Sequence, residues 1–182
     1  MAGFEADTRD ENLLSTKGVH WVTDLRLFEQ LNGDRNTYGR IATEFSFYIP
    51  LSRDSGLVLA NRIAGGTTTG KPSFFQQMHL GGPLTMRGYR TNRFTGRSML
   101  YHNIELRAKL FNFTSYLFPG SVGLVGFHDL GRVWTPGESS KTWHNSYGGG
   151  FYIIPAEVVL IQALAARSDE GTLPYVSIGF RF

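Results

Sequence analysis

The side chains that most often carry catalysis are scattered in this 182-residue sequence. It has no cysteine, which excludes a thiol nucleophile, a zinc-thiolate site and a disulfide framework. His128 and Asp129 are adjacent, but strand neighbours face opposite sides, so the two cannot act together. No G-x-S-x-G elbow is present, and Gly148–Gly150 lies within a predicted strand and is therefore no phosphate loop. We predict a protein without enzymatic activity, cofactor or metal. The histidines are dispersed, at His20, His79, His102, His128 and His144.

The composition favours an all-β protein. Aromatic residues make up 14% of the chain and there are 22 glycines, yet no stretch approaches the ~18–20 consecutive apolar residues of a membrane-spanning helix. The net charge of +3 is too small to indicate a nucleic-acid partner. Residues 1–14 contain four acidic residues and do not resemble a secretory signal.

Alternation of apolar and polar residues predicts eight strands. In the clearest strand, Phe45 and Phe47 lie on one side, and Glu44 and Ser46 on the other. The seventh strand alternates poorly, and its faces are not assigned. The predicted strands are residues 19–27, 40–49, 57–64, 100–110, 122–134, 147–154, 158–167 and 176–182.

The connections between these strands differ in length on the two sides of the sheet. The turns at 50–55, 112–119 and 155–156 fall on one side, and the connections at 66–96, 135–144 and 168–173 fall on the other. Outer-membrane barrels have tight periplasmic turns and longer outer loops. The pattern is typical of such a barrel with both termini in the periplasm.

The residues on the two faces indicate which side lines the interior. Large apolar side chains share one face, whereas the other mixes charges with glycine and alanine, which suits a polar lumen and a lipid-facing exterior. The fold class predicted is a transmembrane antiparallel β-barrel. A soluble lipocalin-like barrel, with the apolar face inside, is the alternative. Four aromatics near strand ends are placed as interfacial girdles: Trp21, Trp134, Trp143 and Tyr147.

Two histidines interrupt the predicted apolar face. His102 and His128 fall on this face of neighbouring strands, where contact with hydrocarbon is unfavourable. They therefore lie at the level of the lipid headgroups or mark a contact with another protein.

Four motifs occur in order in the second half of the chain. Gly81–Arg90 reads GGPLTMRGYR, Asn103–Leu106 reads NIEL, and Phe127–Trp134 reads FHDLGRVW. The fourth is the terminal strand with Val176, Ile178, Phe180 and Phe182. On these motifs, residues 80–182 closely resemble the C-terminal part of the Omp85 superfamily of outer-membrane barrels.

The resemblance implies roles for individual residues. The loop arginine of the family folds into the lumen and pairs with acids of the following strands, which here implies Arg87 with Glu105 and Asp129. Gly88, Tyr89 and Gly131 belong to the same motifs, and the glycines would leave room for the loop. The alternative is a solvated Arg87, with the acids paired to other cations. The terminal strand corresponds to the family's barrel-assembly signal: Val176, Ile178, Phe180 and Phe182.

The resemblance also implies a function. Residues 1–182 would form a single Omp85-like barrel domain in a bacterial or organelle outer membrane, with a lumenal or extracellular loop at about 66–96. It would help membrane proteins insert or cross, or perturb the bilayer. The alternative is a structural or binding barrel. The implied partners are outer-membrane lipid, the barrel-assembly machinery during biogenesis, a client membrane protein and a second copy of the chain.

The predicted size conflicts with the predicted loop. Family members usually carry POTRA domains and sixteen strands, whereas eight strands close into a barrel filled by its own side chains. A loop of about 30 residues does not fit there. Either the loop caps the barrel, or the barrel is widened or unclosed, or two copies pair edge to edge into sixteen strands.

Overall fold

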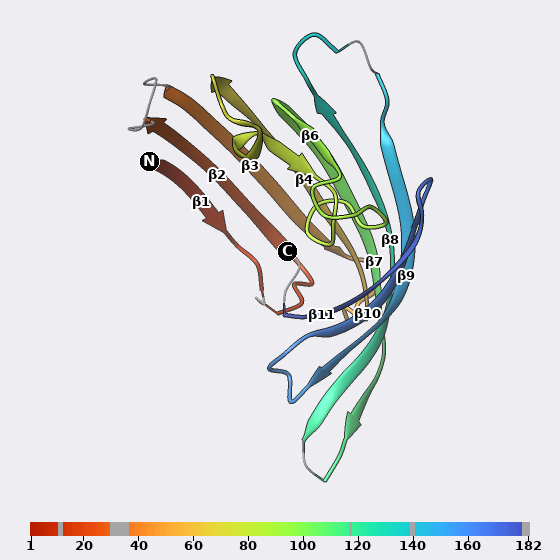
Figure 1. The fold of residues 1–182 in the computed structure, drawn as a ribbon. Helices are drawn as coiled ribbons and strands as arrows, with labels where there is room; N and C mark the ends of the chain where they lie inside the picture. Colours follow the sequence, from red (N-terminus) through yellow and green to blue (C-terminus); the bar gives the residue numbers. More distant parts are fainter. Residues whose placement is uncertain (11–12, 30–36, 117, 139–140, 180–182) are drawn as a thin grey trace.

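One antiparallel sheet of nine strands dominates the computed structural model, which describes residues 1–10, 13–29, 37–116, 118–138 and 141–179. Each strand pairs with the next one in the sheet, without crossovers, and the sheet is strongly curved (Figure 1). Within the described residues, no helix is long and apolar enough to cross a membrane. The strands are β1 (Ala2–Asp7), β2 (Gly18–Glu29), β3 (Thr37–Pro50), β4 (Leu57–Gly70), β7 (Ser98–Thr114), β8 (Pro119–Trp134), β9 (His144–Pro155), β10 (Ile161–Ser168) and β11 (Gly171–Ile178).

The long connection between β4 and β7 lies on the concave side of the sheet (Figure 1). It contains a short 3₁₀ helix, η1 (Phe74–Gln76), and a small hairpin of β5 (Met78–Leu80) and β6 (Phe94–Gly96). Met78, Leu80 and Met86 are fully buried, so this connection is packed against the sheet rather than solvated. We call residues 71–97 the inner loop.

The two faces of the sheet have opposite character, which follows from the period of two in the sequence. Apolar side chains on the outer, convex face are exposed, whereas polar side chains on the inner face are buried. This is the reverse of a soluble barrel and confirms the face assignment made from alternation. Exposed outer residues include Leu25, Ile41, Phe45, Ile63, Leu100, Leu106, Leu124 and Phe151; buried inner residues include Ser46, Arg62, Asn103, Glu105, Arg107, Asp129, Ser146 and Gln162.

The prediction of eight strands missed β1. With nine strands, the described sheet begins at one end of the strands, at Ala2, and finishes at the other, at Ile178, rather than having both termini on one side. β1 pairs with β2 over its whole length, from Ala2↔Leu25 to Asp7↔His20. It contains one large apolar residue, Phe4, so its alternation is weak, and only its partner identifies it as a strand.

The predicted closure of the barrel is also not observed. The described residues of β1 and β11 form the two edges of the sheet, and no ladder joins them. Of the three solutions considered for the inner loop, the structure therefore has an unclosed sheet, with the loop inside its curve.

Several boundaries at the C-terminal end differ from those expected. The loop predicted at residues 168–173 is a tight turn, because β10 ends at Ser168 and β11 begins at Gly171. The last strand, expected at 176–182, ends at Ile178 in the described residues; Phe180 and Phe182 lie outside them. The faces of β10, left open above, are now defined by its burial: Gln162, Leu164 and Ala166 point inward.

The connections between strands lie at two opposite ends of the sheet. We call the end with residues 51–56, 115–118 and 156–160 the turn end, and the end with the inner loop and residues 135–143 the loop end. At the turn end, Leu13 and Leu14 of the β1–β2 connection pack against Tyr152, Ile154 and Leu160. This connection borders a cavity of about 710 Å³.

Candidate functional site

Glycines allow the inner loop to reach the centre of the sheet. Gly81, Gly82 and Gly88 have φ angles of +121°, +93° and +85°, a region that L-residues rarely adopt. Gly88 also passes so close to β9 that an added Cβ would lie 3.0 Å from the Ser146 Cβ. Only glycine meets both requirements there. Between these glycines, the Arg87 side chain points at the inner face of β7 and β8.

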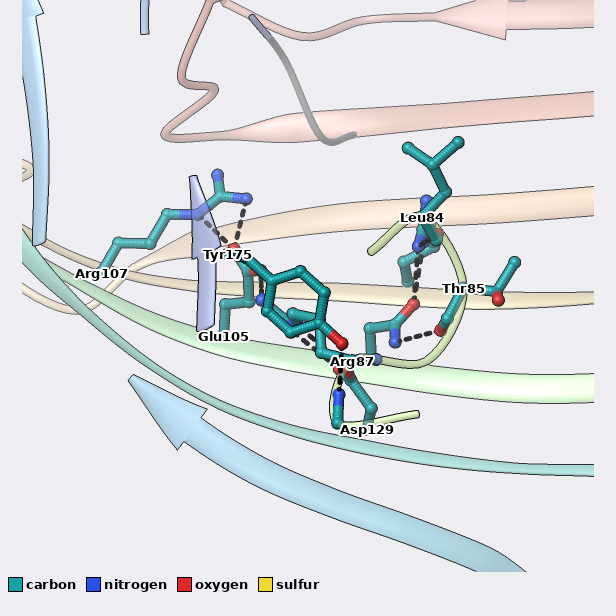
Figure 2. A network of polar contacts seen from close by, with 10 residues as sticks. Leu84, Thr85, Arg87, Glu105, Arg107, Asp129 and Tyr175 are labelled. Carbon is teal, nitrogen blue, oxygen red and sulfur yellow. Dashed lines mark hydrogen bonds and ion pairs between the residues drawn. The ribbon is translucent and has the colours of Figure 1, made fainter. Parts of the chain in front are cut away.

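Arg87 makes four hydrogen bonds to two carboxylates (Figure 2). Its Nε and Nη2 donate to the two oxygens of Asp129 at 2.8 and 2.7 Å, and its Nη1 donates to Glu105 at 2.6 Å. The backbone N–H of Arg87 also donates to Asp129, at 2.9 Å. The guanidinium therefore grips one acid with two parallel bonds and keeps a further donor for the second acid.

The charges in this network are balanced by a second arginine. Arg107 donates from Nε to the other oxygen of Glu105 at 2.9 Å, and its Nη2 lies 2.8 Å from the same oxygen. Arg87, Glu105 and Asp129 are at most 2% exposed. A buried carboxylate without a cation is costly, so the network depends on each partner.

The Arg87 guanidinium stacks on the aromatic ring of Phe127. The Arg87 Cζ lies 3.4 Å from the centroid of Phe127, where a cation–π interaction is favourable. Gly148 makes room for this ring, because a Cβ at Gly148 would lie 2.7 Å from the Phe127 Cζ. The backbone of β10 imposes the same requirement, because this Cβ would also collide with the Ala165 carbonyl oxygen.

A third arginine, Arg62, binds the backbone of the inner loop. Arg62 of β4 donates through Nη2 to the Leu84 carbonyl, and through Nε and Nη2 to Asn103 Oδ1 at 3.0 and 2.8 Å. Asn103 in turn donates to the Thr85 carbonyl at 2.9 Å. We did not predict this anchor. The sequence did contain an indication of this anchor, because the alternation placed Arg62 on the polar face and Asn103 belongs to the NIEL motif.

The residues after Arg87 connect the inner loop to the C-terminal strands. Gly88 donates its backbone N–H to the Tyr175 hydroxyl at 2.9 Å, and its carbonyl accepts from Ser168 Oγ at 2.7 Å. The Tyr89 hydroxyl lies 2.6 Å from Asp169 Oδ1. Burial, and then the bond to Asp169, raise the pKa of the Tyr89 phenol above its ordinary value. The loop therefore joins the β7–β8 centre to β10 and β11.

The remaining predicted residues lie apart from this network. Gly131 leaves room for the inner loop as expected, because a Cβ there would lie 2.9 Å from the Cδ2 of Leu80 in that loop. Val176 and Ile178 are 78% and 73% exposed on the outer face of β11. His102 and His128 are on the outer face as expected, and His102 Nε2 lies 3.3 Å from Asn61 Oδ1.

One cluster of the described residues has the composition of a metal site. Side-chain ligand atoms of Glu5, Asp7 and His20 lie within 4.8 Å of one another. Arg9 already pairs with Asp7 at 2.7 Å. Because the arginine takes the place of a cation, the cluster is best described as an ion-pair network.

Two comparisons relate this geometry to known proteins. The sequence model described as the Omp85 superfamily domain matches residues 2–154. Among solved structures, a crystal structure of BamA from Haemophilus ducreyi lacking POTRA domains 1–3 superposes with a TM-score of 0.75 at 17% sequence identity. The superposition covers 97% of this chain and 41% of the BamA chain, so this chain corresponds to less than half of that protein. At this identity the likeness concerns the fold alone.

Proposed function

Because the chain belongs to the Omp85 superfamily, we propose that it forms the wall of an outer-membrane barrel that helps proteins insert into or cross the membrane, or that perturbs the bilayer, without a catalytic step. At family level, membership already indicates an outer-membrane protein of the insertion and translocation type. The observation that carries the proposal is the inner loop fixed through Arg87 to a buried polar face, behind an apolar outer face. This arrangement suits a wall between lipid and a polar lumen.

Arg87, Glu105 and Asp129 act in this proposal as a lock for the loop. The loop contacts β4 through Arg62, β7 and β8 through Arg87, and β10 and β11 through Gly88. It thereby fastens strands that are not neighbours in the sheet. The loop thus adds contacts that the ladders, which join only adjacent strands, do not make.

The two edges of the sheet supply the activity in this proposal. Unpaired backbone N–H and C=O groups are costly in hydrocarbon, so the exposed edges must be paired within a membrane. We propose that a second copy of the chain pairs with them at rest, and that a strand of a client membrane protein uses the same edges during insertion. The barrel-assembly machinery and outer-membrane lipid would be the other partners.

One feature favours a different function. The cavity at the turn end, lined among others by Asp54, Arg107 and Tyr152, is large enough for a small molecule. A structural or binding barrel would use this cavity and would leave the edges permanently paired. In the first proposal the protein acts on other proteins or on the bilayer. In the second it does neither.

The test uses the purified chain in liposomes. A urea-denatured second barrel protein is added, and its folding is followed by heat-modifiable gel migration, while an entrapped dye reports leakage. We expect faster folding of the client or faster dye release than in empty liposomes. Arg93→Ala, which removes the exposed pair with Glu170, should act as the unchanged chain does. If neither rate rises, the insertion function is rejected and the binding barrel is retained.

Pairing of the edges has its own test, which the absence of native cysteine makes clean. Ala6→Cys and Val176→Cys together place one thiol on the outer side of each edge strand. On oxidation in liposomes we expect a covalent dimer. A fast-migrating monomer with an internal disulfide would instead indicate a single closed chain. Leu106→Cys with Val176→Cys, which pairs a central strand with an edge, is the control.

A further inference from the structure

The hairpin between β7 and β8 extends beyond its neighbours at the turn end (Figure 1). On the β7 side, the ladder to β4 ends at Leu57↔Ala108, whereas the ladder to β8 continues to Thr114↔Pro119. On the β8 side, the ladder to β9 ends at Gly120↔Pro155. We call residues 110–119 the aromatic hairpin, after its one tyrosine and three phenylalanines; its sequence contains no charged residue.

A β-bulge decides which way the aromatic side chains point. The register runs Ala108↔Leu124, Lys109↔Gly123 and then Phe111↔Val122, so Leu110 is an extra residue. Without it, the odd-numbered Phe111 and Phe113 would continue the inner face of Glu105 and Arg107. With it, they share the outer face with Val122 and Leu124, because directly opposed residues point to the same side.

Phe113 packs against its neighbours on this outer face, and Phe111 lies exposed on the same side. Phe113 covers Gly120, since a Cβ added there would lie 2.5 Å from the Phe113 Cζ. The rings of Phe113 and Phe118 lie 6.4 Å apart, edge to face, and Phe111 is 56% exposed. These side chains therefore continue the apolar outer surface of Leu106 and Leu124 toward the tip.

The inner side of the same hairpin is polar. Asn112 pairs with Ser121, and Thr114 follows on the same side. Ser121 borders the cavity at the turn end together with Lys109. The hairpin is thus amphipathic, with aromatics outside and hydrogen-bonding groups toward the aqueous interior.

We propose that the aromatic hairpin lies in the turn-side boundary of the bilayer, with its phenylalanines among the lipid chains just below the headgroups. Three observations select lipid as the occupant: continuity with the apolar outer face, the absence of charge, and a polar side directed away from it. Outer-membrane barrels have girdles of aromatic residues at both boundaries of their apolar band. The inference rests on the proposed membrane location and adds a second lipid contact, outside the regular wall.

The experiment uses single cysteines carrying an environment-sensitive fluorophore, in phosphatidylcholine vesicles with nitroxide-labelled lipid. Phe113→Cys reports the hairpin, Leu106→Cys reports the middle of the wall, and Glu138→Cys, at an exposed position, reports the loop end. We expect a shallow nitroxide to quench the Phe113 label strongly and iodide to quench it weakly. The Leu106 label should be quenched most by a deep nitroxide, and the Glu138 label by iodide.

The outcomes separate this inference from the proposed function. If the Leu106 label is quenched by lipid and the Phe113 label only by iodide, the hairpin is in water and the inference fails, while the membrane wall stands. If the Leu106 label is not quenched by lipid, the proposed wall itself fails. A Phe113 label shielded from both quenchers would mean that a second copy covers the hairpin. Ser115→Cys, which keeps all phenylalanines, guards against an effect of the lost ring and should show the same shallow quenching.

Discussion

The centre and the edges of the sheet are built differently. At the centre, β7 and β8 have 17 and 16 residues and bury an arginine between two acids. At the edges, β1 and β11 have 6 and 8 residues, and one polar contact of β1 with β2 joins His20 to a Glu5 side chain that is 66% exposed. The difference indicates that the wall is stabilised from the middle, through the inner loop, and leaves its edges available for other strands.

The largest effect should come from removing the central arginine. Arg87→Ala leaves Asp129 and Glu105 buried without their main donor, and we expect a loss of about 3–5 kcal/mol in the free energy of unfolding. Urea titration and heat-modifiable gel migration measure it. At the edge, Glu5→Gln should cost about 0–1 kcal/mol, since the pair is exposed. Equal losses at the two sites would contradict the comparison.

The bond between the loop and β11 should matter less. Tyr175→Phe removes the acceptor of the Gly88 N–H, so that a partly buried donor loses its partner. We expect a loss of about 1–3 kcal/mol in the same urea titration. Tyr147→Phe on the exposed outer face is the control and should change stability by less than about 0.5 kcal/mol. A Tyr175→Phe protein as stable as this control would show that the loop does not hold β11.

A smaller effect is expected at the glycine that follows Arg87. Gly88→Ala introduces strain at a φ of +85°, worth about 1–2 kcal/mol, and a close contact with Ser146. Gly137→Ala is matched in φ, at +83°, but its Cβ would have no atom within 4 Å. The excess loss in Gly88→Ala over Gly137→Ala measures the packing of the loop. Equal losses in the two variants would mean that the loop can move away from β9 without a loss in the free energy of unfolding.

The smallest effect concerns alkaline pH. The pKa of Tyr89 is raised in the folded protein, so its contribution to stability is complete below the ordinary tyrosine pKa of about 10 and is lost as pH rises toward the folded value. We expect the unchanged chain to lose more stability than Tyr89→Phe between pH 9 and 11, as measured by urea titration at each pH. Parallel pH curves would place Tyr89 outside the coupling between loop and wall.

The inner face could be predicted because it depends on a local period. Alternation alone placed Glu105 and Asp129 on the polar side of adjacent strands, and the family motif added Arg87. The structure brings these three side chains together. The contact between Arg87 and the Phe127 ring could not be predicted from residue types alone. It depends on Gly148 of the next strand, which leaves space for the ring.

The elements that were missed depend on partners distant in the sequence. β1 is recognisable only beside β2, and Arg62 finds the Leu84 carbonyl only once the loop has folded inward. The bulge at Leu110 cannot be predicted from a strict period of two, which places Phe111 on the inner face. Closure was expected from strand number, but the inner loop occupies the concave side and the sheet remains unclosed.

The charge balance of the Arg87 network has a consequence for how the protein responds to its surroundings. Arg87 and Arg107 carry two positive charges and Glu105 and Asp129 two negative charges, all nearly inaccessible to solvent. Dissolved ions screen charges that they can approach, and these four are out of reach. The Arg87 anchor of the inner loop therefore keeps its strength in dilute and in concentrated salt. The exposed Arg93–Glu170 pair at the loop end, by contrast, weakens as salt rises, so ionic strength acts on the rim of the wall and leaves its centre unchanged.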